Sequence, residues 1–228
     1  MEAYGYADAG ARRAATNATV FEAASLGKPV FAYAVLKLAD AGRLDIDAPL
    51  IGLAPALAEA GEFGGTITAR HVLSHTTGLP NWRSEARPFQ CHFPPGKRFS
   101  YSGEGYVCLQ SAIERLTSEP LDAVARRLVF EPLGMSRSSY DAALSGAAIA
   151  IPHDRDGPLQ KIARKPNAAS SLHTTAEDYA RFLQAVLEGE GLSSAMAREW
   201  LRPNRRVPAS FFAALDPVGE PALHPSVA

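Results

Sequence analysis

The sequence has no long apolar run and almost no net charge. No stretch of its 228 residues approaches the ~20 consecutive apolar residues of a membrane-spanning helix, so no membrane span is expected. Lysine and arginine number 23 against 24 aspartate and glutamate residues, which gives a formal net charge of -1. Proteins that bind nucleic acid concentrate basic residues on one face. This balance of charges therefore argues against nucleic acid as a partner.

Cysteine is also scarce. The chain has only two, Cys91 and Cys108. They form no C-x-x-C pair and do not have the spacing of a zinc site, so no metal centre is predicted. The two residues could form one disulfide bond, but two buried thiols are the simpler interpretation.

The overall composition is that of a folded globular protein. Hydrophobic residues make up 46% of the chain and charged residues 21%, which argues against intrinsic disorder. A chain of this length forms one large domain or two small ones. We expect one domain over residues 1–200 and an irregular tail over residues 201–228, where five prolines interrupt any sustained period.

Helical periodicity dominates the chain. Apolar residues recur every three or four positions in several segments, and Thr174 with Glu177 has the pattern of a capping box. Strand signals are few, and they are confined to residues 1–6 and 65–68. Residues 81–96 and 142–168 have no period and are expected to be long loops, which are often functional. The predicted helices span residues 28–41, 68–73, 106–116, 121–129 and 174–187.

Ser25 and Lys28 form an S-x-x-K motif at the start of the first predicted helix. A spacing of three places both side chains on one face of a turn, so the amine can reach the hydroxyl. A serine hydroxyl becomes a nucleophile only when a base takes its proton, and a desolvated lysine can help to do so. The alternative is a solvent-facing serine and lysine at an ordinary helix start, because so short a motif also occurs by chance.

Tyr101 lies where a loop rich in proline and glycine meets the third predicted helix. A tyrosine at such a junction can project into a cleft and act as a base if cations hold it as phenolate. The alternative is that its ring packs under the loop. His75 and His173 are interpreted as structural.

These motifs lie in blocks that resemble the serine beta-lactamase and penicillin-binding-protein-like hydrolases. The likeness is to the branch of class C beta-lactamases, D-aminopeptidases and related esterases. The blocks occur in the order typical of the family over about residues 1–190. They cover residues 21–30, 34–50, 70–80, 95–106, 131–139 and 172–179.

The resemblance implies an α+β fold of the beta-lactamase/transpeptidase type and a catalytic centre that needs no cofactor. Ser25 would be the acylated nucleophile, and Lys28 would share the proton transfer with Tyr101 of the Y-x-N motif. The implied substrate is a small molecule: a beta-lactam, a D-amino-acid peptide or a short ester. The asparagine of Y-x-N is Gly103 here, so this substrate-binding position lacks the side-chain amide that would bind a substrate carbonyl.

The chain departs from the family near its C-terminus. The family's third motif, Lys-Thr-Gly or His-x-Gly, has no match, because the chain ends in His224-Pro225-Ser226-Val227-Ala228. Relative to the family we expect truncation at both ends and a predominantly helical chain, in which most strands of the central antiparallel sheet are missing from these 228 residues. Three hypotheses follow: an acyl-enzyme hydrolase, a catalytically inactive relative or binding module without the third motif, and an unrelated helical scaffold.

Overall fold

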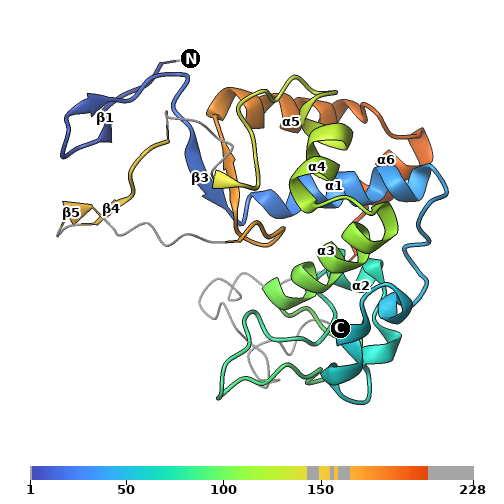
Figure 1. Cartoon of the computed structure of the whole chain (residues 1–228). Helices are drawn as coiled ribbons and strands as arrows, with labels where there is room; N and C mark the ends of the chain where they lie inside the picture. Colours follow the sequence, from blue (N-terminus) through green and yellow to red (C-terminus); the bar gives the residue numbers. More distant parts are fainter. Residues whose placement is uncertain (1, 143–148, 155–156, 159–164, 205–228) are drawn as a thin grey trace. The chain divides into compact units, whose positions relative to one another are not determined.

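Helices dominate the computed structural model of the chain (Figure 1). The structure describes residues 2–142, 149–154, 157–158 and 165–204. The chain divides into two compact units. The first unit consists of residues 1–37 and 120–193, and the second consists of residues 38–119 and 194–228. The expected division into a domain over 1–200 and a tail over 201–228 stays a prediction, because residues 205–228 lie outside the described residues.

The strands of the first unit are short. Within the described residues they pair as three antiparallel two-stranded sheets, β1 with β2, β3 with β6, and β4 with β5. The β3–β6 pair joins two segments far apart in sequence, with Phe21 opposite Thr174 and Ala24 opposite Leu172. The strand expected at residues 1–6 lies instead at Tyr6–Asp8. The bounds are β1 Tyr6–Asp8, β2 Arg13–Ala14, β3 Phe21–Ala24, β4 His153–Asp154, β5 Gly157–Pro158 and β6 Leu172–Thr174.

Three α-helices of the first unit pack around a common core. They are α1 (Gly27–Asp40, of which residues up to 37 belong to this unit), α4 (Leu121–Ala125), which continues into a π-helical turn (Arg126–Phe130), and α5 (Ala176–Glu188). Proline occupies the first turn of α1, where a missing N–H costs nothing. The buried side chains of the core include Val30, Phe31, Tyr33, Leu121, Val124, Val129, Phe130, Tyr140, Leu172 and Phe182.

The N-terminal cap of α5 corrects the sequence prediction by one residue. Thr175, and not Thr174, accepts the backbone N–H of Asp178 at 3.1 Å. Thr174 belongs to β6, and its hydroxyl lies 2.7 Å from the hydroxyl of Ser138 in the protein interior. A buried hydroxyl needs such a partner. Because the Thr174 hydroxyl is bonded to Ser138, it is Thr175 that caps the helix.

The second unit contains short helical turns followed by α-helices. The capping of α2 by Thr68 is confirmed, because the Thr68 hydroxyl accepts the His71 N–H and the His71 ring accepts the Thr68 N–H. The strand expected at residues 65–68 is not formed, because Gly64–Thr66 is a helical turn and only Thr68 pairs, in an isolated antiparallel bridge with Pro49. Gly64 packs so closely on the preceding turn that a Cβ there would lie 1.9 Å from the Leu57 carbonyl oxygen. The bounds are η1 Leu50–Gly52, η2 Pro55–Ala60, η3 Gly64–Thr66, α2 Ala69–Leu73, α3 Gly103–Thr117 and α6 Ser194–Leu201.

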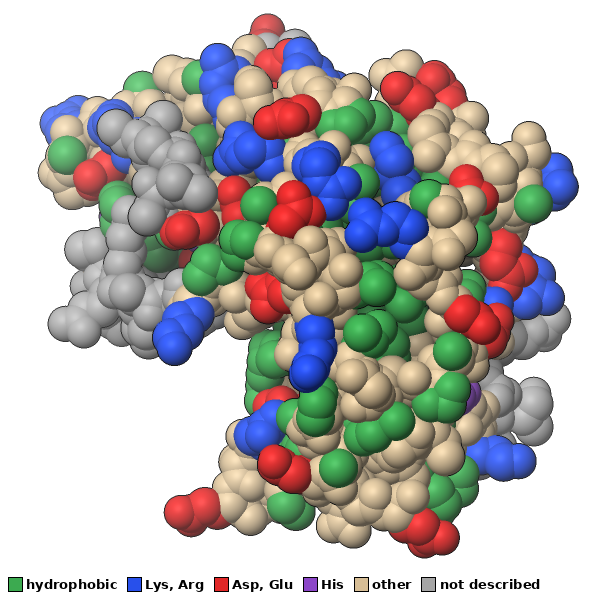
Figure 2. Space-filling view, turned by 45° about the vertical axis from the view of Figure 1, so that its right-hand side comes forward, with side chains coloured by type: hydrophobic (Ala, Val, Ile, Leu, Met, Phe, Trp, Pro, Cys, Tyr) green, Lys and Arg blue, Asp and Glu red, His purple; other side chains and the backbone are tan. Residues whose placement is uncertain are grey.

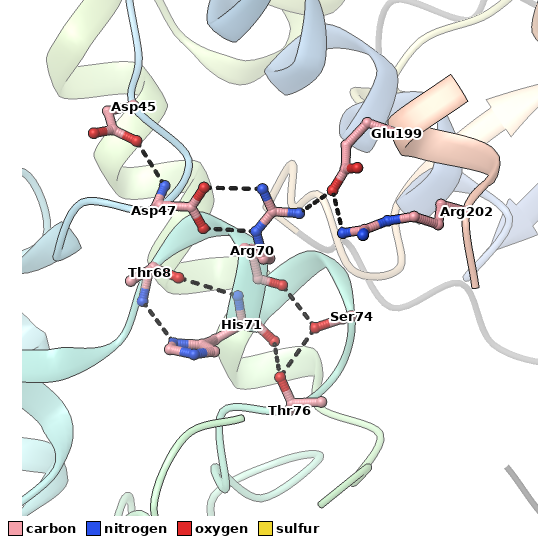
Figure 3. Close-up of polar contacts among 9 residues, drawn as sticks. All are labelled: Asp45, Asp47, Thr68, Arg70, His71, Ser74, Thr76, Glu199 and Arg202. Carbon is pink, nitrogen blue, oxygen red and sulfur yellow. Dashed lines mark hydrogen bonds and ion pairs between the residues drawn. The ribbon is translucent and has the colours of Figure 1, made fainter. Parts of the chain in front are cut away.

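Helix α6 was not expected from the sequence, and a network of ion pairs ties it to α2 (Figure 3). The Arg70 guanidinium binds both carboxylate oxygens of Asp47, at 2.6 and 2.9 Å. It also contacts the carboxylate of Glu199, which in turn accepts a hydrogen bond from Arg202 at 2.9 Å. A planar guanidinium that binds two carboxylates fixes their geometry, so this network holds α6 in place.

The loop expected at residues 81–96 is confirmed, since only an isolated bridge between Ser84 and Arg87 interrupts it. The described part of 142–168 contains β4 and β5, which the sequence did not indicate. Within the described ranges, no helix is long and apolar enough to cross a membrane. On the face shown in Figure 2, basic and acidic side chains are interspersed.

Candidate active site

Ser25 and Lys28 meet at the start of α1, as their spacing predicts. Ser25 precedes the helix by two residues and is exposed, whereas Lys28 is buried, with 4% of its surface accessible. The Lys28 Nζ donates to the Ser25 Oγ at 3.0 Å. The exposed hydroxyl is thus within direct proton-transfer distance of a buried amine.

A backbone carbonyl holds the lysine in this position. Lys28 Nζ donates to the Ala169 oxygen at 2.6 Å, and the Ser25 Oγ lies 3.4 Å from the same oxygen. The carbonyl belongs to a tight turn in which the Asn167 side-chain oxygen accepts the N–H groups of Ala169 and Ser170, both at 2.9 Å. Sequence reasoning missed this turn. An asparagine before small residues is a turn signal, but it does not indicate which side chain the turn will contact.

The residue before the serine has a strained backbone. Ala24 has φ of +46°, a left-handed conformation that a residue with a Cβ rarely adopts. Ala24 lies at a register shift in the β3–β6 pair, opposite Leu172. Strain of this kind persists only where the surroundings enforce it, and it is concentrated at functional sites. Here the strained residue turns the chain from β3 into α1 and sets the position of Ser25.

Gly27 fits α1 closely against the rest of the first unit. A Cβ on Gly27 would lie 2.9 Å from Leu172 Cβ and 3.0 Å from Tyr140 Cε1. The buried Tyr140 also donates its O–H to the Gly27 carbonyl. The start of α1, and with it the Ser25–Lys28 pair, is therefore fixed by contacts that leave no room for a side chain at residue 27.

Tyr101 lies in the second unit, just before α3. Its ring stacks on His75, with centroids 4.4 Å apart and an interplanar angle of 24°. His75 in turn accepts the backbone N–H of Ser102 through Nδ1 at 3.1 Å. The histidine therefore supports the Tyr101 segment, in agreement with its structural interpretation. Of the three predicted residues, the structure brings Ser25 and Lys28 together within the first unit, and it describes Tyr101 within the second.

Gly103 is the buried first residue of α3. Its N–H donates to both the carbonyl and the side-chain oxygen of Asn81, each at 3.0 Å. The Ser102 hydroxyl caps the helix by accepting the Gly105 N–H at 3.0 Å. The loop that contains Asn81 thus lies directly against the position of the family's asparagine.

The two cysteines are free and buried. Burial raises the pKa of Cys91 to about 11 and that of Cys108 to about 12. A thiol with so high a pKa is almost entirely protonated at neutral pH and is a poor nucleophile. The interpretation as two buried thiols is confirmed.

Comparisons with known proteins agree with the fold and identify the family. A family model described as Beta-lactamase matches residues 1–219. Esterase EstB of Burkholderia gladioli is 30% identical over 83% of this chain and 62% of the esterase. Penicillin-binding protein 4 of Amycolatopsis lactamdurans is 31% identical over 55% of this chain and 37% of its own length. The chain therefore spans less than two thirds of these relatives.

Solved structures show the same likeness. The D-amino acid amidase from Ochrobactrum anthropi SV3, in complex with L-phenylalanine amide, has a TM-score of 0.72 and 25% identity, over 86% of this chain and 63% of the amidase. The octameric penicillin-binding protein homologue from Pyrococcus abyssi has a TM-score of 0.79 and 24% identity, over 91% of this chain and 54% of the homologue. The predicted beta-lactamase/transpeptidase-like fold is confirmed, and the chain belongs to the beta-lactamase family.

Proposed function

We propose that the protein is a serine hydrolase that forms an acyl-enzyme on Ser25, with Lys28 and Tyr101 as proton-transfer partners. The observation that carries the proposal is the 3.0 Å hydrogen bond between the buried Lys28 Nζ and the exposed Ser25 Oγ. An activated serine needs a neighbouring group that can take its proton, and the Ala169 carbonyl keeps the amine at that distance.

The proposed reaction has two steps. In the first, Ser25 Oγ attacks the substrate carbonyl carbon, and its proton passes through the Lys28 and Tyr101 pair to the leaving group as the carbonyl–leaving-group bond breaks. In the second, water attacks the acyl-enzyme, gives up a proton along the same route, and releases Ser25 and the acid. Backbone N–H groups near the start of α1 would favour the negative charge on the tetrahedral oxygen.

The proposed substrate is a small ester, amide or beta-lactam. These classes share the same attack on a carbonyl carbon, and the walls of the site decide among them. The names of the relatives include an esterase, a penicillin-binding protein and an amidase. Gly103 lacks the amide of the Y-x-N motif, which favours an ester over substrates that present an amide carbonyl to be bound.

An inactive relative or a binding module is the second candidate. The observation in its favour is that no Lys-Thr-Gly or His-x-Gly sequence occurs in the 228 residues. In the family this motif supplies a cation and one oxyanion donor, and loss of one such donor costs about 10²–10³ in rate. A protein of this kind would bind the substrate but turn it over very slowly.

A fluorophosphonate probe and p-nitrophenyl acetate separate the two candidates. The hydrolase is expected to bond covalently to the probe, and Ser25→Ala should abolish both the bond and the turnover. Lys28→Ala and Tyr101→Phe should each slow acylation by ~10² or more. Ser136→Ala, at an exposed serine of the same unit, is the matched control and should react as the parent does. Full turnover by Ser25→Ala would overturn the assignment.

A further inference from the structure

We propose that Trp82 forms an apolar wall of the substrate site beside Tyr101 and directs the protein toward esters with an apolar acyl chain. The inference rests on the proposed function and deepens it by naming the substrate class. It is carried by three features of the second unit: the contact of Trp82 with Gly103, the anchoring of the residues on both sides of Trp82, and the exposure of its indole.

The first feature is that Trp82 and Asn81 occupy the place where a side chain of residue 103 would begin. A Cβ on Gly103 would lie 2.8 Å from Trp82 Cζ2 and 2.9 Å from the Asn81 carbonyl oxygen. Both distances are below any normal contact with carbon or oxygen, and the second involves backbone. An asparagine therefore cannot be accommodated at position 103 with the loop in this conformation. The polar amide of Y-x-N is replaced here by the edge of an indole ring.

The second feature is the anchoring of the loop on both sides of Trp82. On one side, the Asn81 carbonyl accepts the N–H groups of Gly103 and Glu104, each at 3.0 Å. On the other side, Glu104 accepts the Arg83 N–H at 3.0 Å and binds the Arg83 guanidinium at 2.7 and 2.9 Å.

Glu104 is itself only 5% exposed. A buried carboxylate bound by a backbone N–H and two guanidinium N–H groups is a strong and directional anchor. The backbone of Trp82 is therefore fixed between two tied residues. A wall that is already ordered costs no conformational entropy when a substrate binds.

The third feature is that the indole is partly open to solvent. Trp82 is 42% exposed although its ring contacts Gly103. The ring contacts Gly103, which is two residues from Tyr101 in the same unit. The indole presents a broad apolar surface with a single N–H donor, which suits an alkyl or aryl group better than a peptide-like amide.

The test uses p-nitrophenyl acetate, butyrate, hexanoate and octanoate with the parent protein and with Trp82→Ala. Burial of one methylene changes affinity by about fourfold. We therefore expect the parent kcat/KM to rise with chain length. In Trp82→Ala the value for octanoate should fall by ~10-fold or more, mainly through KM, while the value for acetate stays within about twofold. Trp82→Phe should keep most of the preference for long chains.

Two further variants keep the result interpretable. Leu187→Ala removes another exposed apolar side chain, on α5, and should leave the chain-length profile unchanged. If Trp82→Ala does not melt as a folded protein, Trp82→Gln provides a longer side chain without the apolar ring, and it should lose the same preference.

The outcomes distinguish this inference from the proposed function. Ser25-dependent hydrolysis with the same chain-length profile in the parent and in the Trp82 variants would overturn the inference alone. An equal loss of kcat/KM for acetate and octanoate in Trp82→Ala would also overturn the inference, because it would indicate that Trp82 has a structural role. No Ser25-dependent hydrolysis of any ester would overturn both.

Discussion

The carboxylate of Asp122 is expected to govern the stability of the region that holds the start of α1. Its Oδ1 accepts the Tyr140 N–H at 2.7 Å and the Ser139 hydroxyl at 2.8 Å. Tyr140 is fully buried, and its own O–H donates to the Gly27 carbonyl. Asp122 thus connects the first turn of α4 to the helix start that carries the Ser25–Lys28 pair. Asp122→Ala removes this connection.

The size of the effect follows from the partners that lose their acceptor. The buried Tyr140 N–H would be left unpaired, at a cost of about 1–3 kcal/mol. Ser139 would lose less, because its hydroxyl also donates to the Asp141 carbonyl at 2.9 Å. The Arg126 contact of Asp122, at 3.4 Å with an arginine side chain that is 40% exposed, contributes less than ~1 kcal/mol. Together these suggest a loss of about 3 kcal/mol in the free energy of unfolding.

Thermal and urea denaturation of Asp122→Ala and Asp122→Asn provide the assay. A loss of this size should lower Tm by about 6–12 °C in a chain of this length. Asparagine keeps an oxygen in the position of Oδ1, so Asp122→Asn should lose only about 1 kcal/mol. If the alanine variant loses under ~1 kcal/mol, or if both variants lose equally, the Tyr140 N–H does not depend on this oxygen and the reasoning is wrong.

Three further predictions concern other groups. Burial lowers the pKa of His71, so the unfolded state binds more protons below about pH 6.5, and stability should fall as the pH drops through that region. When Tm is measured from pH 7.5 to 5, Tm should depend less on pH in His71→Gln than in the parent. An unchanged slope of Tm against pH would contradict this prediction. Gly27→Ala should lower the free energy of unfolding, measured by urea denaturation, by about 1–3 kcal/mol, because the new Cβ would lie 2.9 and 3.0 Å from side-chain atoms. An unchanged free energy of unfolding would mean that α1 can shift to make room for the methyl group. Cys91 and Cys108, with pKa values raised to about 11 and about 12, should resist iodoacetamide at pH 7.5 until the protein is unfolded. Rapid alkylation of the folded protein would show that burial does not protect these thiols.

Features encoded by neighbouring residues were predictable from the sequence. The helix over residues 28–41 is observed as Gly27–Asp40, and the Thr68 cap of α2 is as expected. The β3–β6 pair was not predictable, because strands of four and three residues carry no clear period and their pairing depends on contacts across the chain. Two adjacent threonines made the cap of α5 ambiguous, and the pairing of Thr174 within β6 decided between them.

The same distinction applies to the candidate site. The S-x-x-K spacing is local, so the approach of Lys28 to Ser25 follows from the sequence alone. The Ala169 carbonyl that holds Lys28 comes from a turn more than a hundred residues away in sequence, and no local pattern links the two. The glycine at position 103 was visible as a departure from Y-x-N, but its physical cause, the Trp82 ring and the Asn81 carbonyl, was not.

Gly27 and Gly103 have the same role in the two motifs. Each is the first residue of its helix, α1 or α3, and each lies where a Cβ would come within 3.0 Å of a neighbour. Close packing at these two residues fixes the helix start, while Ser25 and Tyr101, the proposed nucleophile and base, lie two residues earlier and outside the packed helix. The rigid contact and the chemical group are thus on different residues of the same short motif. A hydroxyl can then remain accessible to a substrate while the backbone that carries it stays fixed, which is the condition for a preorganised nucleophile or base.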